Sequence, residues 1–183
     1  MMQSARAEKW VVIIPRLPSE PSRYRVAVWR ELRRAGAVQL GQGTWTLPDI
    51  TGTAAEIAKI AGLVAESGGE VLVLAAKGWG EPDAALVRAR FDEARRAEWT
   101  EFASECDKAL AELRSEIAKQ KFTLAELDEE EQNVERLRRW HRELSVRDAF
   151  GAADPAEMQA RLDDCTAALT QFTELVYAAL GMA

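Results

Sequence analysis

The spacing of apolar residues changes near residue 81, and this change divides the chain into two parts. Before it, apolar residues gather in short runs separated by glycine and proline. After it, they recur at intervals of three and four residues, which is the period of an amphipathic helix. We therefore expect two domains: an α+β domain over residues 1–80 and a helical bundle or arm over residues 81–183.

The first part predicts the element order strand, helix, strand, strand, helix, strand. Residues 10–14 and 70–76 are continuous apolar runs typical of central strands. Two shorter strands on either side of a glycine turn at 41–43 predict a hairpin, and helices are expected over 22–35 and 49–66. This order indicates a ferredoxin-like (βαββαβ) fold, in which an antiparallel four-stranded sheet carries two helices on one face.

Capping residues set the expected ends of these two helices. Ser22 is expected to cap the first helix, and Gly36 is expected to end it in a left-handed conformation. Thr51 or Thr53 is expected to cap the second helix, and Glu56 follows Thr53 at the spacing of a capping box.

The second part predicts a three-helix all-α extension. A break is expected near residues 122–123, and Asp154 followed by Pro155 is expected to begin the last helix. The apolar stripes predict an antiparallel bundle or a helical arm, closed on itself or on a second subunit. Cys106 and Cys165 lie on these stripes, so we expect buried thiols and neither a disulfide nor a metal site.

The helix expected over residues 22–35 is rich in arginine. Its apolar stripe must face a core, while most of its arginines lie opposite that stripe or beside it. A guanidinium group binds phosphate or another oxyanion through paired hydrogen bonds. The alternative interpretation is a solvated face whose arginines pair with nearby acids. The candidate DNA- or oxyanion-binding residues are Arg23, Arg25, Arg30, Arg33 and Arg34.

The formal net charge of −6 is unevenly distributed along the chain. Residues 1–80 hold ten Lys and Arg against seven Asp and Glu, whereas residues 81–183 hold fourteen against twenty-three. The first part can therefore meet an anion, although its excess of positive charge is small for a domain that binds nucleic acid.

The usual signatures of catalysis are missing from the sequence. It contains no CxxC, P-loop or GxGxxG motif, and His141, its only histidine, is interpreted as structural. Related ferredoxin-like nucleases hold a metal with an aspartate at the end of the first strand, where this chain has Ile14, Pro15 and Arg16. We expect no enzyme, no cofactor and no metal.

No apolar run reaches the about 20 residues of a membrane span, so we expect no membrane association and a cytoplasmic location.

Several segments together resemble the N-terminal domain of the chromate resistance protein ChrB family. The family pattern has an opening strand with a proline-rich exit, an arginine-rich helix with a tryptophan, a glycine, and a strand pair ending in Leu-Pro. The corresponding residues here are 10–18, 22–30, 36–37 and 43–48, with further likeness at 68–70, in the helix around Phe91 and at 147–151. The chain is also similar to the middle domain of PaaX-type repressors.

The resemblance implies a chromate-responsive transcriptional regulator of a chromate efflux operon. It implies promoter DNA as the partner of the five arginines named above, with chromate as a possible ligand. Related proteins dimerise, and a homodimer is expected. The alternative function is an oxyanion-sensing or protein-interaction module that does not bind DNA. Longer family members carry a second, C-terminal domain. If sensing or effector chemistry lies there, these 183 residues lack it or act with a separate partner.

Overall fold

The computed structural model describes residues 9–181, which form two compact units that divide after Asp92. The sheet unit comes first, and the helical unit begins at Glu93. Helix α3 (Glu81–Lys119) contributes its first turns to the sheet unit and the remainder to the helical unit. The expected boundary at residue 80 lies at the start of α3. Residues 1–8 and 182–183 of the two expected domains lie outside the described residues.

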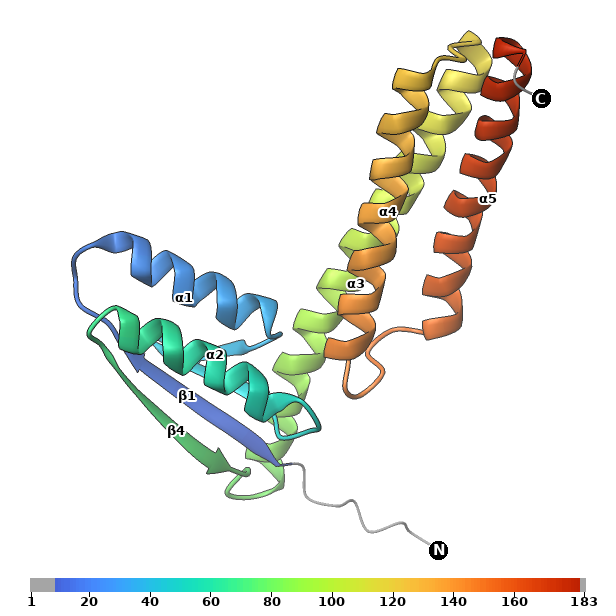
Figure 1. Ribbon diagram of the computed structural model, residues 1–183. Coiled ribbons are helices and arrows are strands. Elements are labelled where there is room, and N and C mark those ends of the chain that lie inside the picture. Colours follow the sequence, from blue (N-terminus) through green and yellow to red (C-terminus); the bar gives the residue numbers. More distant parts are fainter. Residues whose placement is uncertain (1–8, 182–183) are drawn as a thin grey trace, which may run out of the picture. The chain divides into compact units, whose positions relative to one another are not determined.

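The described residues form four strands and five helices, as the predicted α+β class with a helical extension requires. All strand pairs in the sheet unit are antiparallel, in the spatial order β2-β3-β1-β4. Two helices cover one face of this sheet (Figure 1). The elements are β1 (Trp10–Arg16), α1 (Ser22–Arg34), β2 (Val38–Gly41), β3 (Thr44–Pro48), α2 (Thr53–Glu66) and β4 (Glu70–Ala76).

The core of the sheet unit lies between the sheet and its two helices. Successive side chains of a strand point to opposite faces, which places Val11 and Ile13 of β1 on the helix side. On the other face, the Trp10 ring packs edge-to-face on Phe91 of α3, with ring centroids 5.6 Å apart. β1 is therefore covered on both sides at its start. The core residues contributed by α1, β3 and α2 are Val28, Leu32, Trp45, Leu47, Ile60 and Val64.

The two apolar runs are expected to form neighbouring or central strands; β1 and β4 are neighbours, but β4 is not central. It lies at the edge of the sheet beside β1, and Leu72 and Leu74 are 50% and 46% exposed. Leu72 pairs with Ile14 and Leu74 with Val12, so both leucines lie on the face opposite α1 and α2. An apolar run reports a preference for burial, but it does not fix the lateral place of a strand in a sheet.

The end of α1 follows the prediction, whereas its start does not. Gly36 has φ +79°, and the Ala37 amide donates a hydrogen bond of 2.9 Å to the Leu32 carbonyl oxygen, which closes the helix. At the start, Pro21 is the capping residue and no side chain caps the helix, so the predicted Ser22 cap is wrong.

The predicted caps of α2 are also wrong. Gly52 is the capping residue, and α2 begins at Thr53. The Thr53 hydroxyl donates a hydrogen bond of 2.8 Å to the Pro48 carbonyl oxygen and so closes the preceding turn. Glu56 forms an ion pair with Arg34 in place of a capping box.

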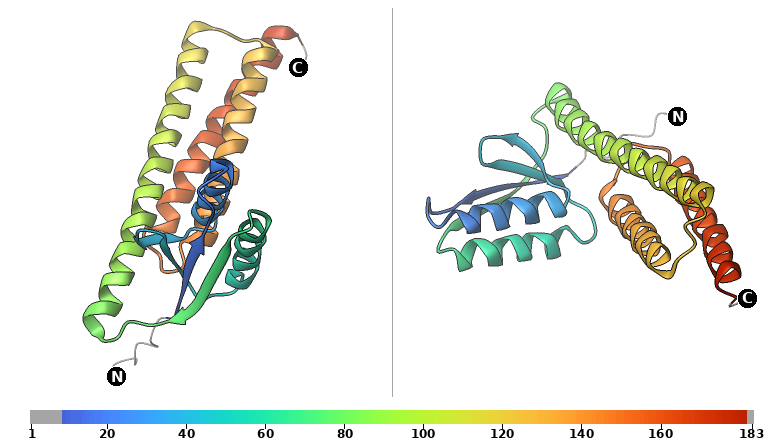
Figure 2. Two further views of the ribbon diagram at one scale, coloured as in Figure 1. Left: turned by 90° about the vertical axis from the view of Figure 1, so that its left-hand side faces the viewer. Right: turned by 90° about the horizontal axis from the view of Figure 1, so that it is seen from above.

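The helical unit contains the rest of α3 together with α4 (Leu124–Arg147) and α5 (Pro155–Leu180), which lie side by side (Figure 2). The predicted break is confirmed, since Thr123 caps α4 by accepting a hydrogen bond from the Glu126 amide at 3.2 Å. The predicted start of α5 is also confirmed, because Asp154 accepts one from the Ala156 amide at 2.9 Å.

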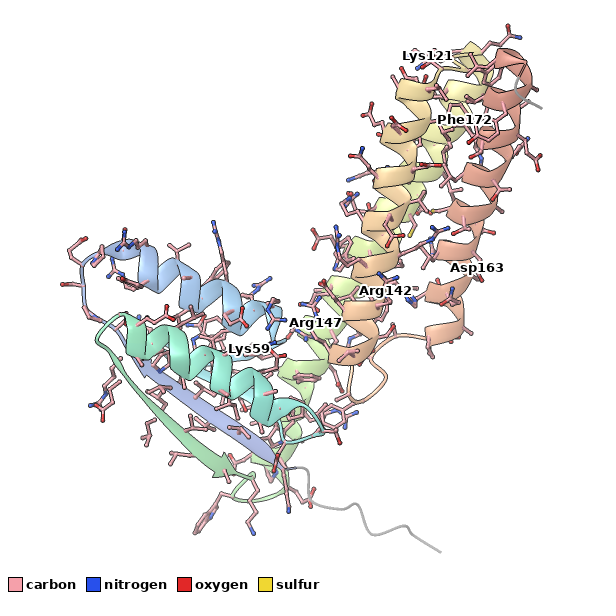
Figure 3. All side chains as sticks on the ribbon, in the orientation of Figure 1. Lys59, Lys121, Arg142, Arg147, Asp163 and Phe172 are labelled. Carbon is pink, nitrogen blue, oxygen red and sulfur yellow. The ribbon has the colours of Figure 1, made fainter. Side chains whose placement is uncertain are left out.

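The core of the helical unit is continuous along all three helices. Phe172 of α5, labelled in Figure 3, is completely buried. Cys106 and Cys165 are free and buried, as predicted, and the Cys165 thiol donates to the Cys106 carbonyl oxygen at 3.5 Å. A hydrogen bond with Cys165, together with burial, raises the pKa of Cys106, which keeps that thiol protonated and unreactive.

No helix in the described part of the chain combines the length and the apolar character needed to cross a membrane.

The segment between α4 and α5 is held by one carboxylate. Asp148 accepts a hydrogen bond from the Trp99 indole nitrogen at 2.9 Å and another from the Ala152 amide at 2.9 Å. Gly151 has φ +71°, a conformation that favours glycine. This part of the family-like segment 147–151 therefore has a structural role, because it ties the α4–α5 connection to α3.

We predict that Asp148→Ala lowers the free energy of unfolding by about 2 kcal/mol, because it leaves the Trp99 and Ala152 donors without their acceptor. Urea unfolding followed by circular dichroism measures the change. Asp128→Ala is the matched control, since Asp128 is an exposed acid on α4 with no hydrogen bond or ion pair to any described residue. Equal midpoints for the two variants would contradict the structural role of Asp148.

Candidate nucleic-acid interface on helix α1

Helix α1 is oriented by the side chains that it buries. Val28 and Leu32, one turn apart, are each 1% exposed and pack into the core of the sheet unit. Burial of this stripe leaves the basic side of the helix toward solvent. All five predicted arginines are exposed, but the structure divides them into three groups by what they contact.

Arg34 is already neutralised within the sheet unit. Its Nε donates to Glu31 Oε2 at 2.9 Å, and its Nη2 contacts Glu56 Oε2 of α2 at 2.5 Å. The Arg34 guanidinium holds the pKa of Glu31 below its ordinary value, because the ionised carboxylate accepts these hydrogen bonds. Arg34 therefore links α1 to α2, as the alternative interpretation of a paired, solvated face expects.

Two other arginines lie over aromatic rings. The guanidinium carbon of Arg23 lies 5.0 Å from the centre of the Tyr24 ring, and that of Arg33 lies 5.4 Å from the centre of the Trp29 ring. Such cation–π contacts restrict the position of a guanidinium, and Arg23 Nη2 also donates a hydrogen bond of 3.4 Å to the Tyr24 hydroxyl. Trp29 is 49% exposed, so an indole and an arginine share the surface.

Arg25 and Arg30 remain, and they differ from the other three. Within the described residues, neither forms a hydrogen bond, ion pair or ring contact. Their guanidinium donors therefore face water and are available to an external anion. Together with Trp29 and Arg33 they form what we call the basic face of α1: Arg25, Trp29, Arg30 and Arg33.

The start of α1 is also suited to an anion. Its first turn contains no acidic residue and no side-chain cap, so within the described residues the amides of Ser22 and Arg23 keep their donors, whereas that of Tyr24 donates to the Pro21 carbonyl oxygen at 3.4 Å. Trp29 lies on the basic face and is exposed, so its fluorescence can report an anion bound there, whereas Trp45 is buried in the core.

Sequence reasoning missed the exposed apolar side chain of Val26, which lies beside the basic face and is 44% exposed. A helical projection places Val26 and Trp29 away from the buried stripe, so the signal was present in the residue spacing.

The single histidine lies in the helical unit, far along the chain from α1. His141 is half-buried between the rings of Trp99 and Phe102, with centroid distances of 5.4 and 5.5 Å. Burial lowers its pKa, so the imidazole is neutral near pH 7. This environment is that of a packing residue. Within residues 9–181, no group of three or more His, Cys, Asp or Glu side chains is arranged to hold a metal ion.

These features describe a small antiparallel sheet that carries a basic helix, followed by a helical unit. The family described as "Protein ChrB, N-terminal" matches residues 25–183, which include most of α1 and the whole helical unit. The chain belongs to this ChrB N-terminal family, as its sequence motifs predict.

A curated relative, Protein ChrB from Cupriavidus metallidurans, is 28% identical over 130 residues. The alignment covers 71% of this chain and 36% of that protein, so the chain matches only about a third of the relative's length. No solved structure shows significant similarity to the chain.

We predict that Arg34→Met lowers the free energy of unfolding by about 1 kcal/mol at pH 7, whereas Arg30→Met changes it by less than half as much. Of these two arginines, only Arg34 pairs with a carboxylate of α2, that of Glu56. Because the pKa of Glu31 is lowered in the folded protein, this stabilisation is present above the ordinary pKa and is lost as the pH falls through the lowered value. The difference between the variants should therefore narrow below about pH 4.

Thermal and urea unfolding at pH 7 and at about pH 3, below the ordinary pKa of a glutamate, provide the measurement. If both methionine variants had the same stability at pH 7, the assignment of Arg34 to the α1–α2 contact would be wrong.

Proposed function

We propose that this protein is a transcriptional regulator associated with chromate resistance, and that the basic face of α1 contacts DNA phosphates. The observation that carries the proposal is that Arg25 and Arg30 are exposed and unpaired among the described residues. Membership of the ChrB family supports the link to chromate. In this proposal the protein is not an enzyme, needs neither cofactor nor metal, and acts in the cytoplasm.

The dimensions of the basic face support contact with a duplex. Arg25 and Arg33 are eight residues apart, which corresponds to about 12 Å along a helix. That length is similar to the width of the major groove, about 12 Å, so the exposed side of α1 can lie against a duplex with Arg25 and Arg30 near phosphates. Arginine–phosphate contacts fix position and carry no sequence information, and they make binding dependent on salt.

The sheet unit supports a ferredoxin-like topology, which we include in the proposal. Its elements follow one another as β1-α1-β2-β3-α2-β4, and β1 lies between β3 and β4.

A second candidate function is oxyanion sensing without DNA. It is favoured by the uncapped start of α1, where amide donors lie next to Arg23 with no acid in the first turn. Chromate is a tetrahedral dianion that such donors can hold. Bound there, it would quench the exposed Trp29, and sulfate is the control ligand.

We predict that the double variant Arg25→Ala/Arg30→Ala binds duplex DNA more weakly and reduces the slope of log K against log salt by about two, because two phosphate contacts are lost. Arg34→Ala should retain the wild-type slope, since that guanidinium is held by Glu31 and Glu56. Fluorescence anisotropy of a labelled duplex at several salt concentrations measures both quantities. An unchanged slope in the double variant would remove Arg25 and Arg30 from the interface.

The expected homodimer is also a proposal, and the edge strand β4 supports it. Among the described strands, β4 has no partner on its outer side, and its exposed side chains include Leu72 and Leu74. The one charged residue of β4, Glu70, is at its start, and the apolar remainder of such an edge strand is a surface that another chain can pair with. Antiparallel pairing of two β4 strands would be self-complementary, as a two-fold interface requires.

We predict a solution mass of twice the 20.3 kDa chain for the wild type and of one chain for Leu74→Lys, because an ammonium group would face the apolar interface. Light scattering coupled to size exclusion provides the measurement. Val146→Lys is the control, since Val146 is a 77% exposed apolar side chain on α4 and is not part of strand β4. A monomeric wild type would reject the dimer.

A further inference from the structure

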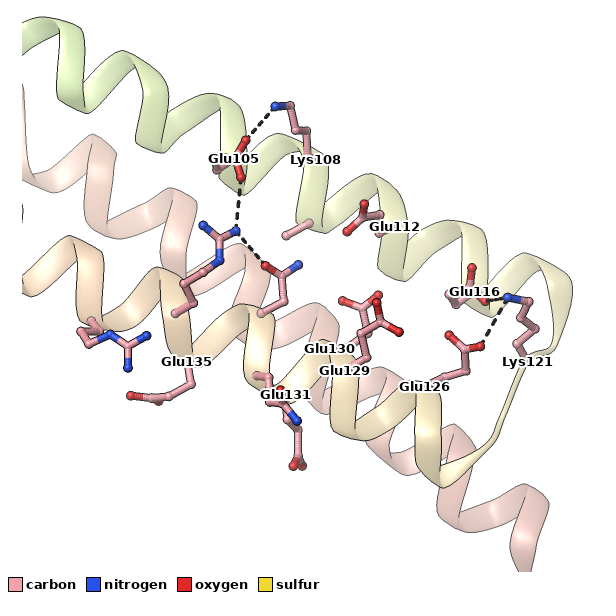
Figure 4. Close-up of a pocket in the computed structure, with 15 residues that line it drawn as sticks. Glu105, Lys108, Glu112, Glu116, Lys121, Glu126, Glu129, Glu130, Glu131 and Glu135 are labelled. Carbon is pink, nitrogen blue, oxygen red and sulfur yellow. Dashed lines mark hydrogen bonds and ion pairs between the residues drawn. The ribbon is translucent and has the colours of Figure 1, made fainter. Parts of the chain in front are cut away.

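A charged groove lies between α3 and α4 in the helical unit, and DNA binding by α1 makes no use of it. Its volume is about 1150 Å³, which is large enough for an extended small molecule. Figure 4 shows carboxylates reaching into this groove from both helices. The acids that matter here are Glu112 and Glu116 from α3, and Glu126, Glu129 and Glu130 from α4.

The ends of the groove are neutralised by ion pairs. At one end, Lys121 contacts Glu116 at 3.2 Å and Glu126 at 3.4 Å. At the other end, Arg136 contacts Glu105 at 3.2 Å. Lys121 and Arg136 are therefore matched to acids, as the dashed lines in Figure 4 show, whereas Arg139, which also lines the groove, forms no ion pair with any described residue.

The middle of the groove holds carboxylates without a cation. Glu112, Glu129 and Glu130 form no ion pair with any described residue. They come from both walls, and Figure 4 shows their carboxylates gathered in the same part of the groove. Three like charges placed together repel one another unless a positive group lies among them.

Glu130 is the residue that points most directly to a ligand. Its side chain is only 6% exposed, and its Oε2 atom has no hydrogen-bond partner within residues 9–181. Burial, followed by the charges of Glu112 and Glu129, raises the pKa of Glu130, although a side-chain hydrogen bond with Asn133 acts in the opposite direction. A buried acceptor without a donor is costly, and nearly all such groups in proteins are satisfied by some partner.

The chemistry of the groove selects the class of ligand. The described residues offer no cluster of three or more acids close enough to ligate a metal ion directly. The unpaired acids are instead spread over both walls of the groove, with Glu112 on α3 and Glu129 and Glu130 on α4. An aliphatic polyamine carries several ammonium groups along one chain, and these supply N–H donors together with positive charge.

We propose that the α3–α4 groove binds a linear polyamine, with ammonium groups that donate hydrogen bonds to Glu130, Glu112 and Glu129. The alkyl segments of such a ligand need no polar partner, and its charges match the unpaired acids in the middle of the groove. The groove shares no residue with the basic face of α1. Its acidic lining selects a cation, whereas the arginines of the basic face select an anion.

Isothermal titration of the full chain with spermidine at low ionic strength tests the proposal. We expect saturable binding by the wild type and about tenfold weaker binding by Glu130→Gln and by Glu112→Gln, since each removes a charged acceptor. Asp128→Asn is the matched control: it removes one negative charge from α4 at an exposed position outside the groove, and should bind like the wild type. Circular dichroism establishes that each variant is folded.

Three results would overturn the proposal. The first is no saturable heat with the wild type, which would mean that Glu130 is satisfied by its own proton. The second is equal weakening by Asp128→Asn and Glu130→Gln, which would indicate a diffuse effect of charge. The third is binding of Mg²⁺ as tight as that of spermidine, which would indicate a site for any divalent cation. Because the groove is distinct from α1, Arg25→Ala/Arg30→Ala should leave spermidine binding unchanged, and Glu130→Gln should leave DNA binding unchanged.

Discussion

The packing of α1 against the sheet is the constraint on which the account of this protein depends. Val28 and Leu32 are almost fully buried against a core that includes Ile13 of β1 and Ile60 of α2. These contacts fix the rotation of α1 about its own axis, because turning it would expose both side chains to water. The arginines are exposed as a consequence of that apolar packing.

Within this fixed helix, local charge decides which arginines are available. Arg34 is held between Glu31 and Glu56, so its charge stabilises the contact of α1 with α2. Arg25 and Arg30 have no such acid within the described chain. One helix thus combines an electrostatic link to its neighbour with a surface open to anions. The available charges in the helical unit have the opposite sign, because acidic side chains, including the buried Glu130, line the α3–α4 groove.

The features that local residue spacing governs could be predicted from the sequence. The order of strands and helices, the break before Thr123 and the start of α5 at Asp154 depend on residues close together in the chain. The edge position of β4 could not be predicted in this way, since it is decided by which strands pair. The five arginines were recognised as a group, but their division depends on Glu56, which is 22 positions from Arg34. In the sequence, Glu130 belongs to an acidic run that is predicted to be exposed. In the folded helical unit its side chain is buried.

The central claim is that a ChrB-family chain with this basic helix binds DNA and responds to chromate. The most direct test is a gel-shift of the purified protein on the DNA upstream of its own gene, at two salt concentrations, with chromate and with sulfate. The account predicts a shifted complex that weakens as salt rises and is released by chromate but not by sulfate. No shift at either salt concentration would contradict it and would leave oxyanion or protein binding as the role of α1.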